Sequence, residues 1–233
     1  MGEMKRITHH IGGSYWNGKP ERTSDVYNPA TGKVTAKVDL ASAATVDHAV
    51  DIASKAQHDW RNASLAKRVQ VLFSFREILN ARKEEVAQLI TAEHGKVLSD
   101  ALGEVTRGME VVEFACGIPH LLKGSYSEGA STSIDVYSIR QPLGVCAIIS
   151  PFNFPAMVPM WFFPIAIAAG NSVIIKPSEK DPSPANLIAE MWKEAGLPDG
   201  VFNVVHGDKE SVDRLLEHPG IASISFVGSK IGR

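Results

Sequence analysis

Two short polar segments of this sequence each follow an apolar run and carry side chains that could bind a ligand. The first, Ser150-Pro-Phe-Asn-Phe-Pro155, presents the amide of Asn153 between two prolines that stiffen the chain. The second, Lys176-Pro-Ser-Glu179, presents a cation, a hydroxyl group and a carboxylate within four residues. Open α/β sheets bind ligands beyond the carboxyl ends of their strands. Because a nucleotide can use all of these groups, the two segments predict a nucleotide site at a sheet edge.

The elements that must position these segments follow a regular order from Gly144 onward. Near-continuous apolar runs predict strands at Val145–Ile149, Val173–Lys176, Val201–Val205 and Ser223–Val227. The intervening segments predict helices at about 159–169, 184–195 and 210–217. This spacing implies a parallel sheet with right-handed crossovers, and such apolar strands suit burial on both faces. The predicted fold class is therefore α/β, a doubly wound, parallel, Rossmann-like sheet.

Because parallel strands bring their carboxyl ends to one edge, four polar segments are expected to meet there: 150–153, 176–180, 206–207 and 228–229. Any one of these segments could be an ordinary surface loop, but the set favours a ligand site. The segment Gly228-Ser-Lys-Ile-Gly232 is expected to open a helix whose N-terminal amides favour a pyrophosphate. It is a weak signal, because it matches neither G-x-G-x-x-G nor the Walker lysine motif.

Helical patterns dominate the first 143 residues, which are predicted to form an N-terminal region beside a partial nucleotide-binding domain of residues 144–233. Thr45 and Ser64 are candidate N-caps, Gly95 is a candidate C-terminal glycine, and a fourth helix is expected from about Ser99 to Ile118. Three of these helices have an expected apolar stripe. For the first helix it is Val46, Ala49, Val50, Ala53 and Trp60, and for the second it is Val69, Leu72, Phe73 and Leu79. For the fourth helix it is Leu102, Val105, Met109, Val112 and Cys116.

Two stretches of this region have β character. Short β-like runs flank a turn cluster within Tyr15–Leu40. Within residues 125–143, the segment Thr132–Arg140 alternates only in part between apolar and polar residues, which is typical of an edge hairpin.

The bulk properties exclude several classes of protein. The net charge of −2 provides no basic field for nucleic acid or anionic lipid. The N-terminus lacks the apolar segment of a secretory signal, and Asn153 and several prolines interrupt the long apolar stretch Val145–Ala169. No histidine or cysteine spacing indicates a metal site. We therefore expect a cytoplasmic protein that binds no nucleic acid, membrane or metal.

Neither cysteine has the setting of a nucleophile. Cys116 falls on the expected apolar stripe of a helix, and Cys146 falls inside a predicted central strand. Two cysteines are too few for a disulfide framework and fit a reducing compartment. Both are predicted to be inert core thiols.

The same segments resemble a known family. The run PFNFPAMVPMWFFPIAIAAGNSVIIKPSEKDPS is similar to the core signature of the aldehyde dehydrogenase superfamily. More narrowly, it resembles the coenzyme A-acylating branch that acts on methylmalonate semialdehyde. Residues 113–124 and 139–145 support this, and the resemblance extends from about Tyr15 to Gly228.

The resemblance implies a role for Asn153, which residue chemistry alone leaves open. An asparagine in this position could simply bond its own loop, as is common in turns. In the family, the matching residue donates its amide N–H to the oxyanion that forms on the aldehyde.

The resemblance also implies a cofactor site for NAD. Lys176 and Glu179 match the pair that grips the adenosine ribose, and the Glu179 carboxylate would disfavour the 2′-phosphate of NADP. The alternative for this pair is a solvated ion pair of little energetic value. Further matches at the cofactor site are Ser150, Phe152, Lys180 and Ser229, although the two glycines around Ser229 lie one residue closer together than is usual in the family.

The sequence allows two interpretations of Arg107. On its helix it lies about 200° from Val105, away from the apolar stripe, so it could be a solvent-facing arginine. In the acylating branch, the matching arginine binds the substrate carboxylate through a bidentate pair. That match makes Arg107 the predicted specificity residue.

The activity that the resemblance implies is the NAD-dependent oxidation of methylmalonate or malonate semialdehyde to propionyl-CoA or acetyl-CoA. Coenzyme A is the co-substrate, and the family member is expected to be a homo-oligomer, a dimer of dimers paired through the arm of residues 125–143. The family nucleophile, a cysteine, belongs to a part of the family sequence that follows Arg233. We therefore expect an incomplete fold without the catalytic domain. The alternatives are a hydrolytic NAD(P)-dependent aldehyde dehydrogenase and a non-catalytic, NAD-binding or subunit-pairing fragment.

Overall fold

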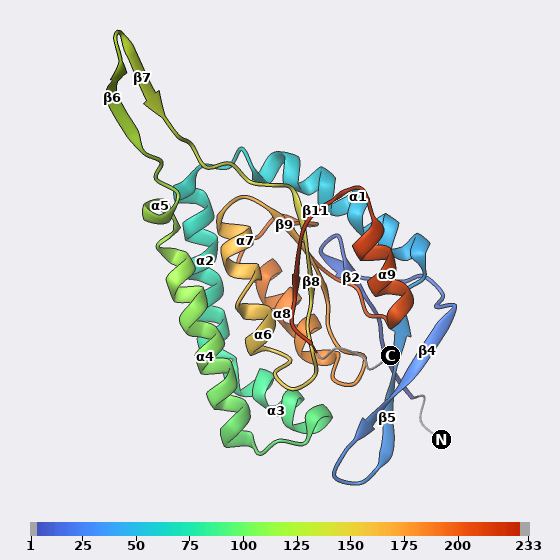
Figure 1. Cartoon of the computed structure of the whole chain (residues 1–233). Coiled ribbons are helices and arrows are strands. Elements are labelled where there is room, and N and C mark those ends of the chain that lie inside the picture. The colour runs from blue at the N-terminus through green and yellow to red at the C-terminus, as the bar shows by residue number, and fades with distance from the viewer. Residues whose placement is uncertain (1–3, 229–233) are drawn as a thin grey trace.

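A six-stranded sheet lies at the centre of the computed structural model, which describes residues 4–228 (Figure 1). Its strand order is β11-β8-β9-β10-β2-β3. The strands are β11 (Ile221–Phe226), β8 (Val145–Ile149), β9 (Ser172–Lys176), β10 (Phe202–Val204), β2 (His10–Ile11) and β3 (Ser14–Tyr15). The first four are parallel, as predicted, whereas β2 and β3 add antiparallel strands that the sequence did not indicate.

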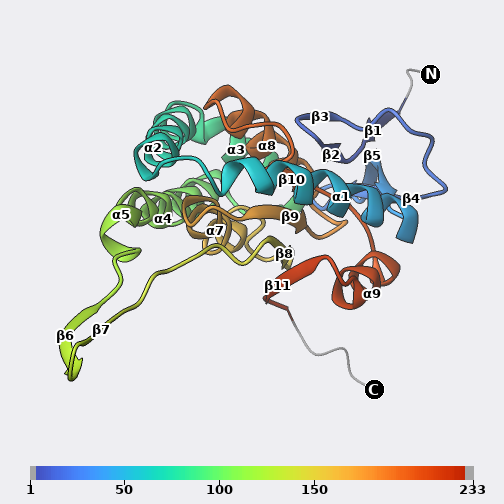
Figure 2. The same cartoon turned by 90° about the horizontal axis from the view of Figure 1, so that it is seen from above.

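Helices cover both faces of this sheet (Figures 1 and 2). On one face, α1 (Ala43–Trp60) and α9 (Lys209–Glu217) share a core with Ala147, Ile149 and Ile174 of the strands. On the other face, a larger core gathers Ile148, Val173 and Ile175 with the helices α2 (Leu65–Ala81), α3 (Lys83–His94), α4 (Leu98–Cys116), α6 (Met157–Met160), α7 (Phe163–Ala168) and α8 (Ser183–Glu194). The doubly wound fold class is confirmed.

The helix predicted over 159–169 is instead two short helices, α6 and α7. Pro164 lacks a backbone N–H, and a proline ring clashes with the carbonyl four residues earlier in a continuous helix. That carbonyl belongs to Met160, where α6 ends. The single-helix prediction was wrong because Pro164 interrupts the helix.

The helix signals at Ser64 and Gly95 are confirmed. The Ser64 side chain accepts a hydrogen bond from the Lys67 amide at the start of α2, and Gly95 ends α3 with a φ of 87°. The N-cap of α1 is Ser42 rather than Thr45. Phe73 was wrongly placed on the apolar stripe of α2, since it is 55% exposed while Phe75 fills the core.

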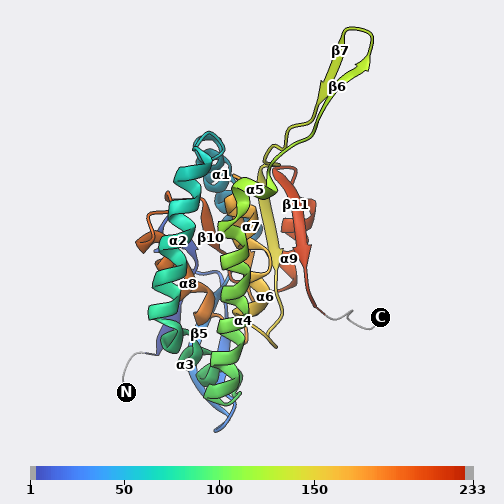
Figure 3. The same cartoon turned by 90° about the vertical axis from the view of Figure 1, so that its left-hand side faces the viewer.

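The hairpin of β6 (Tyr126–Ser131) and β7 (Ile134–Tyr137) projects from the body of the molecule beyond α5 (Ile118–Leu121) (Figure 3). Every residue of its two strands is exposed. A smaller sheet, in the order β1-β5-β4, is formed by β1 (Lys5–Ile7), β5 (Lys33–Leu40) and β4 (Arg22–Asn28). The predicted hairpin is confirmed, and the division of the chain at residue 143 stays a prediction.

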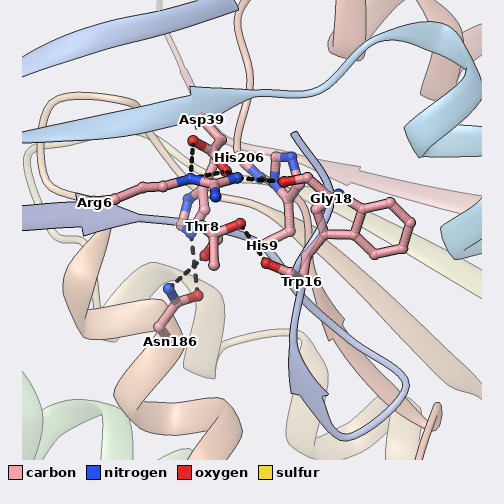
Figure 4. A network of polar contacts seen from close by, with 8 residues as sticks. All are labelled: Arg6, Thr8, His9, Trp16, Gly18, Asp39, Asn186 and His206. Atoms are coloured by element: carbon pink, nitrogen blue, oxygen red, sulfur yellow. Dashed lines mark hydrogen bonds and ion pairs between the residues drawn. The ribbon is translucent and has the colours of Figure 1, made fainter. Parts of the chain in front are cut away.

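A network of buried polar groups fastens the N-terminal segment to the main sheet (Figure 4). The His206 amide donates to His9 Nδ1 at 3.1 Å, and the Asn186 side chain donates to the Thr8 carbonyl at 2.8 Å. Asn186 Oδ1 lies 3.1 Å from His206 Nε2. Nearby, Arg6 forms an ion pair with the buried Asp39 at 2.6 Å.

Within residues 4–228, no helix combines the length and the apolar character needed to cross a membrane.

Candidate functional site

The loops that follow β8, β9, β10 and β11 lie together at the carboxyl edge of the sheet. Lys176 Nζ donates to the Gly207 carbonyl at 2.9 Å, which joins the ends of β9 and β10. The Val227 amide donates to the Ile149 carbonyl at 3.1 Å, which joins the ends of β11 and β8. A cavity of about 340 Å³ lies at this edge, lined by Pro151, Phe152, Asn153, Val227 and Gly228. The expected convergence is therefore present for segments 150–153, 176–180 and 206–207 and for Gly228 of the fourth segment.

Lys176 is buried, and its ammonium group lies 3.9 Å from the Glu179 carboxylate. Burial lowers the pKa of Lys176, and the negative charge of Glu179 opposes that shift. An ammonium group has three donors. One of them is used by Gly207, so capacity remains for ligand hydroxyls beside the half-buried carboxylate.

A larger cavity, of about 510 Å³, adjoins Glu179 on the side of β4 and the turn that leads from β4 to β5. Lys180 Nζ lies over the Phe152 ring, 4.3 Å from its centroid, and both residues line this cavity. The other lining residues are Ser24, Asp25, Tyr27, Pro29, Glu93, His94 and Asp181. Glu179, Phe152 and Lys180 are thus brought together, as a shared cofactor site requires.

Asn153 is exposed in the loop after β8. Its carbonyl oxygen accepts a hydrogen bond from Lys96 Nζ at 2.8 Å. Within the described part of the chain, its side-chain amide makes none of the loop hydrogen bonds that a purely structural role would use. The amide is therefore available to a ligand, and its oxyanion role stays a prediction.

Ser150 directly follows β8 and is only 4% exposed. Its amide donates to the Lys176 carbonyl at 3.2 Å. Its buried hydroxyl has no hydrogen-bond partner among residues 4–228. Ser150 lines neither of the two cavities, so its role at the cofactor site stays a prediction. Ser229, the last predicted cofactor residue, lies outside the described residues.

Arg107 projects from α4 as an exposed side chain, and its Nε lies 3.4 Å from the Met157 sulfur. A thioether is a weak acceptor. Among residues 4–228 Arg107 forms no ion pair, so its guanidinium retains the donors needed for a carboxylate. Met157 lies four residues after Asn153, so Arg107 contacts the segment that follows the predicted oxyanion donor.

Two residues of this region were missed from the sequence. Glu104 of α4 is fully buried, and it accepts hydrogen bonds from the Ala156 and Met157 amides. Its other oxygen accepts from Lys96 Nζ at 2.6 Å. The sequence contains little signal for Glu104, because it lies about 100° from Val105 around the helix, outside the predicted apolar stripe.

Asp181 was also missed. It is 1% exposed and lines the larger cavity. Burial, and then the neighbouring carboxylate of Glu93, raise its pKa to about 8. Asp181 is therefore mostly protonated at neutral pH and can donate a hydrogen bond.

The two cysteines occupy the core positions predicted for them. Cys116 is 8% exposed and Cys146 is 9% exposed. Burial raises the pKa of Cys146 to about 11 and also raises that of Cys116. Neither thiol lines the cavities at the carboxyl edge. No group of three or more histidine, cysteine, aspartate or glutamate side chains within residues 4–228 could hold a metal ion.

Comparison with known sequences places this geometry in context. The model of the aldehyde dehydrogenase family matches residues 16–233. A malonate-semialdehyde dehydrogenase of Pseudomonas aeruginosa is 52% identical over 221 residues, covering 95% of this chain and 44% of that protein. An acylating, mitochondrial methylmalonate-semialdehyde dehydrogenase of Arabidopsis thaliana is 46% identical over 224 residues, covering 96% of this chain and 37% of that protein.

Comparison with solved structures also finds similarity to semialdehyde dehydrogenases. A protein described as a methylmalonate-semialdehyde dehydrogenase of Sinorhizobium meliloti, crystallised with NAD, is 49% identical with a TM-score of 0.96. The match covers 98% of this chain and 47% of that chain. The chain thus spans less than half the length of the relatives that it matches.

Proposed function

The chain belongs to the aldehyde dehydrogenase family, and from this premise we propose that it supplies the cofactor-binding edge and the oxyanion donor of a semialdehyde dehydrogenase. The proposed reaction oxidises methylmalonate or malonate semialdehyde and transfers the acyl group to coenzyme A, giving propionyl-CoA or acetyl-CoA after loss of carbon dioxide. Bound NAD would supply the hydride acceptor for oxidation of the aldehyde carbon. The cysteine nucleophile would come from the part of the family sequence that this chain does not span.

The residues of the chain have distinct roles in this proposal. Lys176 and Glu179 bind the ribose hydroxyls of NAD, with Ser150, Phe152 and Lys180 beside them. The Asn153 amide donates to the aldehyde oxygen as that oxygen becomes negative, and one such donor contributes about 3–4 kcal/mol to the transition state. Arg107 binds the carboxylate at the other end of the substrate.

The observation that carries the proposal is the meeting of the Asn153 segment and the Lys176–Glu179 segment at one sheet edge. The ends of the parallel strands are where such folds bind dinucleotides. The cavity at this edge, whose lining includes Phe152 and Asn153, and the larger cavity, whose lining includes Phe152 and Glu179, leave room for a ligand beside both segments.

The experiment joins this chain to the part of the Pseudomonas aeruginosa relative that it does not span, giving what we call the completed enzyme. NADH formation from methylmalonate semialdehyde is followed with and without coenzyme A, and the product is identified by mass spectrometry. We expect propionyl-CoA. Formation of the free acid at the same rate without coenzyme A would support a hydrolytic dehydrogenase instead.

The exposed hairpin of β6 and β7 supports a role in subunit pairing. Its apolar side chains face solvent, with Tyr137 72% exposed and Ile134 and Val136 each 53% exposed. We assign this surface to contact with a second copy, as in a dimer of dimers. Light scattering of the completed enzyme with and without Ile134→Ser tests the assignment.

A further inference from the structure

Glu104 and Lys96 form hydrogen bonds with the backbone of the loop that carries Asn153. Glu104 Oε1 accepts hydrogen bonds from the Ala156 amide at 2.9 Å and from the Met157 amide at 3.2 Å. Lys96 Nζ donates to Glu104 Oε2 at 2.6 Å and to the Asn153 carbonyl at 2.8 Å. The same ammonium group lies 4.4 Å from the centroid of the Phe154 ring. The loop is therefore held at four of five consecutive residues.

This pair is strongly constrained because it is buried. The Glu104 side chain is 0% exposed and the Lys96 side chain is 10% exposed. A buried carboxylate is tolerated only when its oxygens are paired, and removal of one partner leaves an uncompensated charge. The loop backbone supplies two of the three hydrogen bonds to Glu104. The loop can therefore leave this position only by breaking contacts to a buried charge.

The helix that carries Glu104 also carries Arg107. Residues three apart on a helix lie on neighbouring parts of its surface. Glu104 binds the Met157 amide, and Arg107 Nε lies 3.4 Å from the Met157 sulfur. One helix therefore fixes both the backbone of the Asn153 loop and the arginine predicted to bind the substrate carboxylate.

We propose that Glu104 and Lys96 are positioning residues, which set the location of the Asn153 amide relative to Arg107. The inference rests on the proposed function, in which these two groups bind opposite ends of the substrate. In malonate semialdehyde one carbon separates the aldehyde from the carboxylate. A constant spacing between the oxyanion donor and Arg107 would therefore select short carboxylated aldehydes, and loss of that spacing would reduce turnover.

The first test measures the loop in the chain itself. Backbone order parameters of residues 153–157 are obtained by NMR for Glu104→Gln, for Lys96→Met and for the matched control Glu113→Gln, an exposed glutamate of the same helix. We expect values near those of rigid backbone, about 0.85, to fall below about 0.6 in the first two variants and to stay unchanged in the control. Unchanged values in a folded Glu104→Gln chain would overturn the proposal.

The second test is a double-mutant cycle in the completed enzyme. Glu104→Gln is expected to lower kcat by about ten- to a hundredfold with KM within about twofold, because a small misplacement of a catalytic group has effects of this size. In an Asn153→Ala background the same change should cost less than about twofold, since the donor that it positions is absent. Equal losses in both backgrounds would show a general structural role and would overturn the proposal.

The two tests separate failure of this inference from failure of the proposed function. If Asn153→Ala retains full activity, the oxyanion role is wrong, while the order parameters still decide whether the pair holds the loop. If Glu104→Gln does not fold, Lys96→Arg, which keeps a cation beside the buried Glu104 but changes its reach to the Asn153 carbonyl, is used for both comparisons.

Discussion

Lys176 illustrates how the sheet prepares a single side chain for a ligand. Its burial disfavours the charged form, while Glu179 restores part of the lost stabilisation. Because the Gly207 carbonyl fixes the ammonium group, little side-chain entropy remains to be lost when a ligand binds. Glu179 is the more exposed partner and is the natural site for a test.

Glu179→Gln is expected to weaken NAD binding by about tenfold, because a hydrogen bond to a charged acceptor contributes about 1.5–3 kcal/mol. The affinity for NADP should fall less or rise, since the charge that opposes a 2′-phosphate is removed. Isothermal titration calorimetry of the chain with both cofactors gives the ratio. Glu85→Gln, an exposed glutamate paired with Arg82, is the control. A parallel change in both affinities would remove Glu179 from the ribose site.

Arg107→Leu in the completed enzyme is expected to lower kcat/KM for methylmalonate semialdehyde, mainly by raising KM. The loss of a charge-assisted hydrogen bond should cost about 1.5–3 kcal/mol of binding free energy. Simple aliphatic aldehydes have no carboxylate and should react nearly as before. Arg61→Leu, another exposed arginine without an ion pair among residues 4–228, controls for loss of charge. An equal loss on both classes of aldehyde would assign Arg107 a structural role.

At this scale the sequence singled out polar residues at the strand ends and missed those that support their loops. Asn153, Lys176 and Glu179 were found because polar residues follow apolar strands. Glu104 was overlooked because its partners are the Ala156 and Met157 amides, some fifty residues away in the sequence. Side-chain patterns along a helix do not reveal hydrogen bonds to a distant backbone.

At the scale of elements, the sequence predicted helix ends correctly where a single capping residue determines them. Ser64 starts a helix and Gly95 ends one through their own chemistry, so both were predictable. The exposure of Phe73 and the burial of Phe75 depend on which side of α2 faces Trp192, which stacks on Phe75 at 3.7 Å. The strands β2 and β3, of two residues each, are too short to have a periodic signal.

Gly95→Ala is expected to destabilise the chain by about 2–4 kcal/mol. The backbone at Gly95 has a φ of 87°, and an added Cβ would lie 2.7 Å from Pro29 Cγ. Gly196→Ala is a matched control, because Gly196 has a φ of 85° but no atom within 4 Å of the added Cβ. The control should therefore lose only the backbone term of about 1–2 kcal/mol. Equal losses in urea unfolding would show that the contact with Pro29 is unimportant.

At the scale of the whole molecule, the buried histidines make stability depend on pH. Burial lowers the pKa of His9 to about 4 and lowers that of His206 well below its usual value. Between about pH 6.5 and pH 4 the unfolded chain therefore binds protons that the folded chain does not. Stability should fall as the pH falls through this range, and His9 alone should contribute about 3 kcal/mol.

Thermal unfolding of the chain between pH 7.5 and pH 4 measures this dependence. His9→Gln keeps an acceptor for the His206 amide and removes the titrating group, so it should flatten the curve. His58→Gln, whose side chain is 81% exposed, should leave it unchanged. A curve that is the same in all three proteins would show that His9 titrates normally in the folded state.

The chain by itself is expected to oxidise no aldehyde, with or without coenzyme A. Both of its cysteines lie in the core, and burial raises the pKa of each, so little thiolate forms at neutral pH. The measurement is NADH formation from methylmalonate semialdehyde with the purified chain. NADH formation that Cys116→Ala or Cys146→Ala abolishes would contradict this expectation.

The fastening of the N-terminal segment has a consequence for biosynthesis. His9 and His206, which meet in the folded sheet, are 197 residues apart in the sequence. On a ribosome, β2 can pair with β3 and β1 with β5 early, yet β2 cannot join the main sheet until β10 has left the exit tunnel. The edge of β2 that faces β10 must therefore stay unpaired through most of translation, accessible to chaperones, and closure of the main sheet is expected to be a late, slow step of folding.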